Sequence, residues 1–558
     1  NVFPHDTFRW RGIDGSEIIT HFPPEYTYNS FCTPEVLRRA EKTFHEKAFI
    51  DEFITLMGIG DGGGGPKEEH LEHVLRSANC EGLPRTSFGR ADSLFERLKR
   101  HESELEVWVG ELYLEYHRGT YTTQAATKRN NRRLEQEIRA VEALWSALPL
   151  DQYPATELDA VVKTLLLHQF HDIIPGSSIN AVYRDADRAY AAAFATLDQL
   201  KLRAAQALTS ASAESITFFN CLSHEYQGIM ELPADFAGFQ LLDSQGKGVP
   251  VQREDGRTVA RITVPALAFA AFRRGPVLSD AAIATPAAEA VLENELVRYR
   301  FDANARIVEA LDKQTGKSIL KPGQAGNVLT VYEDTPHNFE AWDIDFYYHQ
   351  QVLENAQGSA WKQTANGAAR QILEFRLSVS NSTMVQEISL EAGSKALEFR
   401  TRVEWSEAQR MLRVAFPLES LATEASCDVA YGHVKRPTHA NTEWDFAKFE
   451  VCAHRYVDIS DSSGGVALLN DCKYGHSVRD NILDLCLLRS PLYPDPDADQ
   501  GSHEFRYVLY PHAGDLVHSA VMPAAACLNR SPLVFAGASP KLTGLPVSLS
   551  GVGVSLEV

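Results

Sequence analysis

"LDAVVKTLLLHQFHDIIPGSS", residues 158–178, joins the two kinds of sequence pattern on which the fold prediction depends. Apolar and amide side chains recur here every three or four residues, the period of one helix face. The residues at this spacing are Leu158, Val162, Leu165 and Gln169. Pro175 and Gly176 predict the helix stop, so His171 and Asp172 come at the end of a helix.

Further helical patterns lie on both sides of this stretch. "PKEEHLEHVLRS" (66–77) carries Pro66 at the expected first helical position. The segment 183–208 is another long helical pattern. One more apolar face is formed by Leu134, Ile138, Val141, Trp145 and Leu148. These patterns predict a helical bundle as a middle domain over residues 86–210.

The segment before the bundle mixes strands and a helix. "EIITHF" (17–22) and "AFIDEFITLMGIG" (48–60) are predicted as buried strands, and "PEVLRRAEKTFHE" (34–46) between them as a helix. Strand–helix–strand order favours an α/β unit with loops gathered at strand ends. We assign residues 1–85 to the end portion of an α/β domain.

The segment after the bundle is rich in strand patterns. Residues 397–405 alternate between apolar and charged side chains, as in a half-buried strand. "LVRYRFDANARIVEAL" (296–311) is predicted as two strands around a turn. Residues 211–558 are therefore assigned to large β-sandwich domains. The fold class is multidomain: α/β, then α, then β.

The amino-acid composition restricts the classes of partner that the protein can bind. The 558 residues have a net charge of −20, which opposes binding to nucleic acid and to anionic membranes. No apolar run is long enough to span a bilayer. The eight cysteines are scattered without a C-x-x-C pair, which favours reduced thiols and a cytoplasmic protein. The sequence does not fix the oligomeric state, and a homo-oligomer stays open.

"GIGDGGGGP" (58–66) places one carboxylate, Asp61, in a run of glycines. Three interpretations remain open: a tight turn capped by Asp61, a loop that exposes a catalytic carboxylate, or a dinucleotide loop. The spacing of Gly58, Gly60 and Gly63 fits G-x-G-x-x-G. A nucleotide-binding oxidoreductase is nevertheless disfavoured, because Asp61 would oppose the pyrophosphate.

Two other segments are candidates for a site. An imidazole such as that of His171 is a good zinc ligand, but from the residues alone helix-end packing with a solvated Asp172 is favoured over a metal site. Residues 333–349 combine carboxylates with aromatic rings, including Trp342 and Asp343. Rings stack on sugar faces and carboxylates accept hydroxyl hydrogens, so this segment suits sugar binding or an aromatic core.

Seven long segments, in order along the chain, together resemble the family 38 glycoside hydrolases, the class II α-mannosidases, and most closely their cytosolic/vacuolar and bacterial branch. These segments are "TFRWRGIDGSEIITHFPPEYTYN" (7–29), "GIGDGGGGP" (58–66), "GELYLEYHRGTYTTQAATKRNNR" (110–132), "LLLHQFHDIIPGSSI" (165–179), "EDTPHNFEAWDID" (333–345), "RPTHANTEWDFAKFE" (436–450) and "LLRSPLYPDPDADQGSHEFRY" (487–507).

The resemblance implies a retaining, zinc-dependent hydrolysis of terminal α-mannosides, with mannose-containing oligosaccharides as partners. It implies that Asp61 is the general acid/base and that His171 is a zinc ligand. Asp172 and Tyr28 correspond to residues that bind the sugar. Trp342 and Asp343 are expected as further substrate-binding residues of the site wall.

This sequence also lacks two segments of the family pattern. The family's first metal segment and its nucleophile segment are not found, and both would precede Asn1. We therefore expect an N-terminally truncated α-mannosidase, with the nucleophile and the remaining zinc ligands upstream. The alternative is a non-catalytic module that binds carbohydrate.

Overall fold

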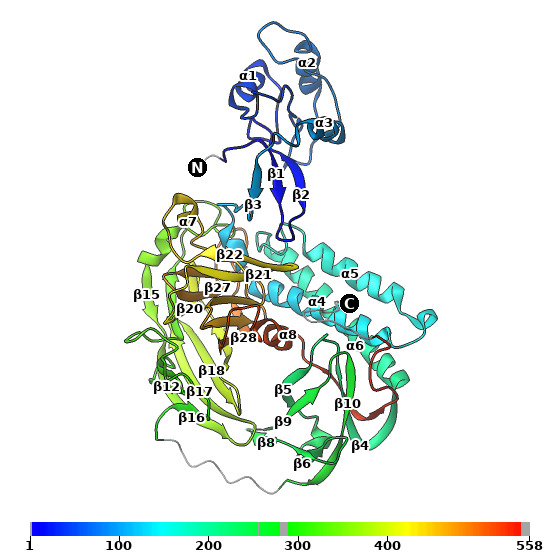
Figure 1. Ribbon diagram of the computed structural model, residues 1–558, viewed down its shortest axis with the longest axis vertical. Coiled ribbons are helices and arrows are strands. Elements are labelled where there is room, and N and C mark those ends of the chain that lie inside the picture. Colours follow the sequence, from blue (N-terminus) through cyan, green and yellow to red (C-terminus); the bar gives the residue numbers. More distant parts are fainter. Residues whose placement is uncertain (1–2, 255, 279–287, 548–558) are drawn as a thin grey trace. The chain divides into compact units, whose positions relative to one another are not determined.

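The computed structural model describes residues 3–254, 256–278 and 288–547 (Figure 1). The chain divides into two compact units, Asn1–Tyr113 and Leu114–Val558, and each is described by itself. The domain limits expected from the sequence, at residues 85/86 and 210/211, stay predictions.

The first unit combines a small sheet with three helices. Its strands are β1 (Thr7–Arg11), β2 (Glu17–His21) and β3 (Val107–Val109), in the order β2-β1-β3. β2 is antiparallel and β3 parallel to β1. The helices are α1 (Pro34–Thr43), α2 (Glu68–Arg76) and α3 (Ala91–Leu98), followed by the 3₁₀ turn η1 (Lys99–His101). The core under them contains Phe44, Ile50, Leu94, Leu98 and Leu105.

Three elements expected in this unit are present and one is absent. The strand at 17–22 and the helices at 34–46 and 66–77 are present as β2, α1 and α2. Helix α2 begins at Glu68 and belongs to this unit, not to the helical bundle with which its pattern was grouped. The strand expected over 48–60 is absent, because its apolar side chains pack on the core from a loop. The Ile54 N–H donates to His21 Nε2 at 3.4 Å instead of to a neighbouring strand. A short apolar run predicts burial more reliably than it predicts a strand.

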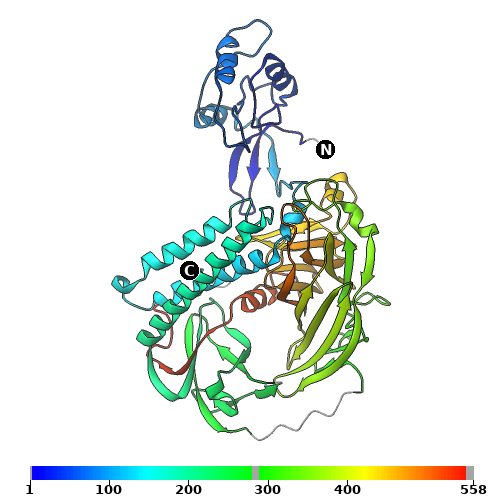
Figure 2. The same ribbon diagram turned by 180° about the vertical axis from the view of Figure 1, so that it is seen from behind.

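The second unit begins with the 3₁₀ turn η2 (Arg118–Tyr121) and three helices that pack together (Figure 2). These are α4 (Ala125–Trp145), α5 (Ala155–His168) and α6 (Asn180–Leu208). The helical middle region is thus confirmed. The predicted buried face of α5 is rotated, because Val161 and His168 are buried where Val162 and Gln169 were expected. Leu148 lies beyond the end of α4.

Antiparallel sheets make up the rest of the second unit. The nine-stranded sheet contains β16 (Gln357–Asn366), β17 (Arg370–Val379), β18 (Ser382–Glu391), β19 (Leu397–Trp405), β28 (Gly501–His512), β25 (Gly464–Asn470), β24 (Tyr456–Asp461), β21 (Glu424–Val429) and β22 (Gly432–Pro437). The six-stranded sheet contains β15 (Val352–Asn355), β14 (Val328–Glu333), β20 (Arg410–Pro417), β27 (Ile482–Arg489), β26 (Gly475–Arg479) and β23 (Val451–Cys452).

Three smaller sheets accompany them. One contains β29 (Leu533–Pro540), β4 (Thr209–Asn220), β10 (Ala268–Val277), β6 (Phe239–Leu242) and β7 (Gly248–Val249). The second contains β5 (Tyr226–Glu231), β9 (Arg257–Val264) and β8 (Val251–Glu254), and the third β11 (Val291–Glu293), β12 (Val297–Phe301) and β13 (Ile307–Asp312). The short helical segments are η3 (Leu150–Gln152), η4 (Ala234–Phe236), η5 (Phe346–Gln350), α7 (Glu443–Ala447) and α8 (Val521–Asn529).

The two largest sheets face each other through aromatic side chains. The Phe416 ring on β20 lies 5.8 Å from Phe399 on β19 and 6.2 Å from Tyr507 on β28. The alternation predicted for 397–405 is confirmed, since the apolar positions of β19 are buried. The predicted strand pair within 296–311 is present as β12 and β13.

Two expectations about composition can be compared with the structure. All eight cysteines are free thiols, as their scattered spacing predicts. Among the described helices, none combines the length and apolar character needed to cross a membrane.

Candidate active site

The glycine loop of the first unit is a closed hairpin turn that presents Asp61. Ile59 and Gly64 close it with two backbone hydrogen bonds of 3.1 Å each. Asp61 lies at its tip with a positive φ of 36° and is exposed. A non-glycine residue in this left-handed region is uncommon, although aspartate tolerates it better than most residues. The loop is therefore a tight turn that also carries an exposed carboxylate.

Gly60 lets a neighbouring segment approach this loop closely. Its N–H donates to Asn29 Oδ1 at 2.5 Å. A Cβ at position 60 would overlap Asn29 Oδ1 and the Tyr28 ring. Only glycine fits without displacing one of these side chains. The Tyr28–Asn29 segment and the tip of the loop are thus held together.

Tyr28 contacts Asp61 directly. Its hydroxyl donates to Asp61 Oδ1 at 3.0 Å, and its side chain is 58% exposed. The hydrogen bond to the Asp61 carboxylate and the charge of that carboxylate raise the pKa of Tyr28. Tyr28 therefore remains a protonated donor at neutral pH. Two residues predicted separately for the site are in this way brought together.

An open hollow of about 500 Å³ lies beside Tyr28. Its lining is mostly apolar and includes Phe22, Pro23 and Tyr26. The dinucleotide interpretation loses its structural context here, since no strand leads into the glycine loop within residues 48–57. A carboxylate beside an apolar, aromatic hollow suits a sugar better than a pyrophosphate.

In the second unit, His171 and Asp172 lie in the loop between α5 and α6. Their side chains are 79% and 46% exposed, and His171 Nε2 lies 3.7 Å from Asp172 Oδ2. The backbone of this loop is held firmly, because Ser178 Oγ donates to the Asp172 carbonyl at 2.7 Å. Both side chains remain available for a ligand.

A buried lysine anchors the same loop. Lys128 Nζ on α4 donates to the carbonyl oxygens of Thr123 at 2.5 Å and Ile174 at 2.6 Å. Gly176 has a φ of 91°, and a Cβ there would lie 2.5 Å from the Thr123 carbonyl oxygen. Burial lowers the pKa of Lys128 to about 7. The loop is thus fastened to the start of α4.

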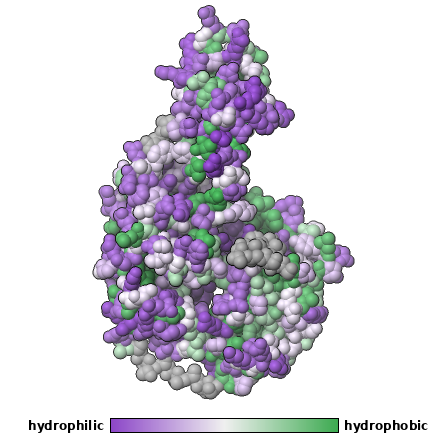
Figure 3. Space-filling view, in the orientation of Figure 1, coloured by the Kyte–Doolittle hydropathy of each residue, from purple (hydrophilic) through white to green (hydrophobic). Residues whose placement is uncertain are grey.

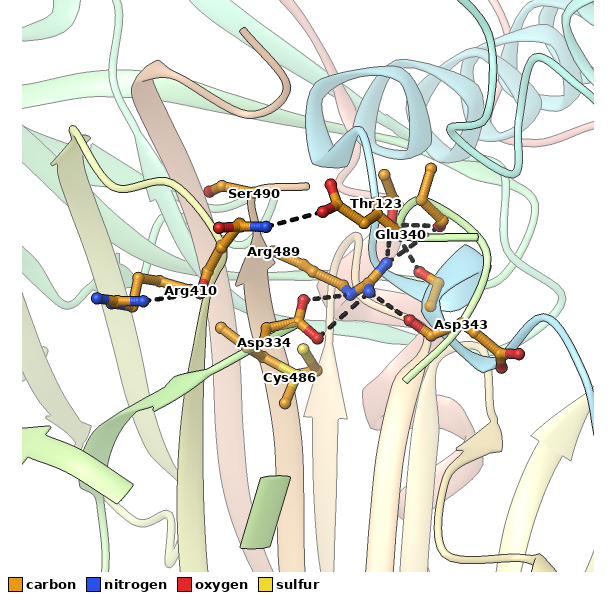
Figure 4. A network of polar contacts seen from close by, with 12 residues as sticks. Thr123, Asp334, Glu340, Asp343, Arg410, Cys486, Arg489 and Ser490 are labelled. Carbon is orange, nitrogen blue, oxygen red and sulfur yellow. Dashed lines mark hydrogen bonds and ion pairs between the residues drawn. The ribbon is translucent and has the colours of Figure 1, made fainter. Parts of the chain in front are cut away.

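Trp342 and Asp343 are held against the same segment by their backbone. The Gly119 N–H donates to the Trp342 carbonyl at 2.7 Å. Arg489 donates to the Asp343 carbonyl, while the Asp343 carboxylate points away from Arg489 (Figure 4). Asp343 Oδ1 is buried and has no hydrogen-bond partner among the described residues. The half-buried Trp342 ring lies 4.7 Å from the exposed His117 ring.

Arg489 makes most of the contacts that hold the segment of Trp342 and Asp343 in place. It pairs with Asp334 at 2.6 Å and donates to Thr123 Oγ1 at 3.0 Å, and both charged side chains are buried. Burial raises the pKa of Asp334, and the neighbouring Arg489 opposes that shift. Thr123 therefore connects the two predicted segments of this unit, because its carbonyl also accepts from Lys128.

The described residues do not form a complete metal site. No group of three or more histidine, cysteine, aspartate or glutamate side chains gathers anywhere in the described ranges. His171 and Asp172 supply two adjacent donors, whereas a catalytic zinc usually has three protein ligands. The pair alone does not hold the zinc ion that the resemblance implies.

The sequence did not single out several residues that shape these loops. Asn29 meets Gly60 across 31 residues of sequence and Lys128 meets Ile174 across 46. Arg489 meets Asp334 across 155 residues and Thr123 across 366. All three lie in segments that carry the family resemblance, at 7–29, 110–132 and 487–507, but these segments do not single them out. Nothing in the sequence around Lys128 marks it as a loop anchor.

Three protein-family models together match most of the chain. Residues 1–111 match the "Glycosyl hydrolases family 38 N-terminal domain", residues 115–208 the "Alpha mannosidase middle domain" and residues 292–497 the "Glycosyl hydrolases family 38 C-terminal domain". These matches give no support to the expected N-terminal truncation, nor to a nucleophile and zinc ligands placed before Asn1.

Curated proteins are similar over almost the whole chain. Alpha-mannosidase 2C1 of Homo sapiens is 36% identical over 557 residues, which cover 97% of this chain and 52% of that protein. The protein of the same name from Mus musculus is 35% identical and covers 100% of this chain and 54% of its own length. Alpha-mannosidase of Saccharomyces cerevisiae is 32% identical, with coverages of 93% and 47%. The chain spans about half the length of these relatives.

A solved structure shares the fold. The crystal structure of an α-mannosidase from Enterococcus faecalis V583 aligns with a TM-score of 0.76 at 16% identity. The alignment covers 97% of this chain and 72% of that one. At this identity the likeness concerns the fold alone.

Proposed function

The chain belongs to glycosyl hydrolase family 38, and from this we propose that the protein is an α-mannosidase. It would remove terminal α-D-mannose residues from mannosides and oligosaccharides with retention of configuration. Three similar proteins that carry the name α-mannosidase support this proposal. The observation that carries it is the exposed Asp61 carboxylate at the tip of the glycine loop, hydrogen-bonded by Tyr28.

Asp61 takes the general acid/base role in this proposal. In retaining glycosidases such a carboxyl group protonates the glycosidic oxygen and then takes a proton from the attacking water. Tyr28 occupies Oδ1 of Asp61, which leaves Oδ2 for the glycosidic oxygen. Two backbone hydrogen bonds between Ile59 and Gly64 hold the hairpin that carries this carboxylate. No residue is assigned as the nucleophile.

Sugar binding is assigned to Tyr28 in the first unit and to Asp172, Trp342 and Asp343 in the second. The exposed Asp172 carboxylate accepts hydrogen bonds from sugar hydroxyls. The Trp342 ring offers a face for the apolar side of a sugar ring. Asp343 Oδ1, buried without a hydrogen-bond partner among the described residues, gains one when a hydroxyl binds.

Zinc is proposed as the cofactor on the basis of the family, with His171 as its ligand in this chain. When bound, it would act as a Lewis acid on substrate oxygens. The pair His171–Asp172 supplies too few donors by itself, so no proposed step passes through the metal. Metal content of the wild type against His171→Ala tests this assignment independently of activity: an equal zinc content in the two proteins refutes it.

The partner and the compartment of the protein are proposed from its family, its net charge and its cysteines. A mannose-containing oligosaccharide is the proposed partner, and the net charge of −20 argues against nucleic acid. Eight free thiols favour a reducing compartment, and we propose the cytoplasm.

The test is hydrolysis of p-nitrophenyl α-D-mannoside by the full gene product, with and without a chelator. We expect release of mannose as the α-anomer, loss of the activity with chelator, and no cleavage of the β-mannoside. A protein that binds mannosides without cleaving any of them would be a carbohydrate-binding module. Such a result refutes the enzymatic proposal.

A further inference from the structure

The second unit exposes a cluster of aromatic rings beside Trp342. Measured between ring centroids, Trp342 lies 4.7 Å from His117 and 5.5 Å from Phe339. The Tyr116 ring follows at 6.4 Å from the His117 ring. The four side chains come from two segments that lie far apart in the sequence, 116–117 and 339–342. We refer to them as the aromatic platform.

Most of the aromatic platform is open to solvent. Tyr116 and Phe339 are each 65% exposed, His117 is exposed, and Trp342 is half-buried. On the face of the protein seen in Figure 3, hydrophilic and hydrophobic residues are interspersed, and hydrophilic residues prevail on much of it. Contiguous exposed apolar groups on such a surface mark a site of interaction more often than they occur by chance.

Two residues of the aromatic platform have a strained backbone. His117 has a φ of 66° and Phe339 a φ of 53°, both in the left-handed region. A bulky residue in this region is an outlier, and such outliers gather at sites that bind ligands. The strain at both residues therefore favours a role in ligand binding.

Hydrogen bonds hold the aromatic platform in this arrangement. The Trp342 N–H donates to the Phe339 carbonyl at 2.8 Å and closes the turn between these two rings. The Thr120 N–H donates to the His117 carbonyl at 3.2 Å. The Gly119 N–H, which donates to the Trp342 carbonyl, joins the two segments. The platform is thus preformed, and a preformed surface loses less conformational freedom when a ligand binds.

The chemistry of the aromatic platform suits a sugar. Aromatic rings stack on the apolar C–H face of a pyranose, while its hydroxyl groups need polar partners nearby. The imidazole of His117 and the hydroxyl of Tyr116 supply polar atoms among the rings. Asp343 directly follows Trp342, and its Oδ1 has no hydrogen-bond partner among the described residues. The platform therefore extends the surface at which Trp342 and Asp343 are proposed to bind sugar.

We propose that the aromatic platform binds a second sugar residue of the substrate, next to the mannose that is removed. Tyr116, His117 and Phe339 favour oligosaccharides over mannosides with a small aglycone, because only an oligosaccharide places a further sugar on these rings. This inference rests on the proposed function, since it narrows the substrate class from α-mannosides in general to mannose-containing oligosaccharides.

Binding of a thio-linked α-mannotriose to the full gene product tests this inference, because the sulfur linkage resists hydrolysis. In isothermal titration calorimetry the wild type should bind this trisaccharide more tightly than methyl α-mannoside. Tyr116→Ala/Phe339→Ala should weaken trisaccharide binding about tenfold, since two stacking rings are lost. Tyr116→Phe/Phe339→Tyr keeps both rings and should retain most of the affinity. Tyr431→Ala is the matched control, since Tyr431 is 99% exposed and has a φ of 63° outside the platform.

Steady-state kinetics separates this inference from the proposed function. The double alanine variant should lose about tenfold in kcat/KM on an oxygen-linked α-mannotriose, mainly through KM, and less than about twofold on methyl α-mannoside. Equal losses on the two substrates would overturn the platform and leave the proposed function intact. A protein that cleaves no α-mannoside but shows the platform effect in calorimetry would refute the proposed function alone.

Saturation-transfer NMR uses only the wild type, in case the variants do not fold. Irradiation of aromatic protein protons should transfer saturation to the second sugar residue of the thio-linked trisaccharide. The inference is overturned if only the terminal mannose receives saturation, if the trisaccharide binds no better than methyl α-mannoside, or if Tyr431→Ala weakens binding as much as the double alanine variant. The first two results would assign the exposed rings to a contact between protein surfaces instead.

Discussion

The loop that carries Asp61 and the loop that carries His171 and Asp172 expose their polar side chains by opposite means. The first loop depends on the absence of a side chain at Gly60, which gives Asn29 and Tyr28 room to approach. The second depends on one added group, the buried amine of Lys128. Added atoms should therefore damage the first loop, and removal of a single amine should damage the second.

The largest effect is expected from Asp61→Asn. An amide of the same shape cannot protonate the glycosidic oxygen, and general acid/base catalysis is worth about 10²–10⁴-fold in rate. The measurement is kcat/KM on an alkyl α-mannoside, whose poor leaving group needs protonation most. A smaller loss on p-nitrophenyl α-mannoside would separate leaving-group protonation from sugar binding.

Asp51→Asn is the matched control for this variant, since Asp51 is exposed in the same unit and outside the glycine loop. It should keep full activity. If Asp61→Asn loses less than threefold on the alkyl mannoside, Asp61 is not the acid/base. The loop would then be a turn with a solvated cap.

Lys128→Met should be the most destabilising change in the second loop. It removes the donor for the carbonyl oxygens of Thr123 and Ile174, and an unsatisfied buried acceptor costs about 1–3 kcal/mol. The free energy of unfolding in urea measures this loss. Lys163→Met, at an exposed lysine on α5 that pairs with Asp159, is the control and should have little effect.

The effect of Lys128 on stability should depend on pH. Burial lowers its pKa from the ordinary 10.5 to about 7. Between these values the unfolded chain holds a proton that the folded chain has lost, so the free energy of unfolding rises with pH. We expect the wild type to gain stability relative to Lys128→Met from pH 7 to pH 10. A constant difference across this range would show that Lys128 is not desolvated.

These two loops also show what the sequence can predict. Helices α4 and α6 and the alternation of β19 were predictable, because their apolar patterns repeat over many residues and their burial follows the pattern. The exposure of Asp61 was predictable as one of three alternatives from the glycines around it. The strand expected at 48–60 failed because a packed loop and a strand bury the same short apolar run.

The contacts that anchor these loops could not be predicted from the sequence, for a different reason. Lys128 meets Ile174 across 46 residues of sequence, and Arg489 meets Asp334 across 155. Such pairs form only when helices and sheets are already packed, and one sequence contains no record of which residues meet. Periodicity locates elements, whereas the support of a site depends on contacts between them.

Gly60→Ala should damage the first loop by adding one methyl group. The new Cβ would overlap Asn29 Oδ1 and the Tyr28 ring, and overpacking of this kind costs about 1–3 kcal/mol. We expect roughly a tenfold loss of kcat/KM as the tip and Tyr28 move apart. Gly65→Ala is the control, since no atom lies within 4 Å of the position that its methyl group would take. Equal activity of the two variants would mean that close packing at Gly60 is irrelevant to the site.

Tyr28→Phe should have the smallest effect, because it removes one hydrogen bond and leaves the Asp61 carboxylate in place. A single neutral donor contributes about two- to tenfold in an equilibrium or rate. The loss should appear in kcat/KM, and Tyr431→Phe, at a fully exposed tyrosine of the second unit, should show none. If Tyr28→Phe instead matches Asp61→Asn, the hydroxyl itself takes part in bond cleavage. The exposed carboxylate would then depend on its donor, and the first loop would resemble the second, in which a single donor decides the outcome.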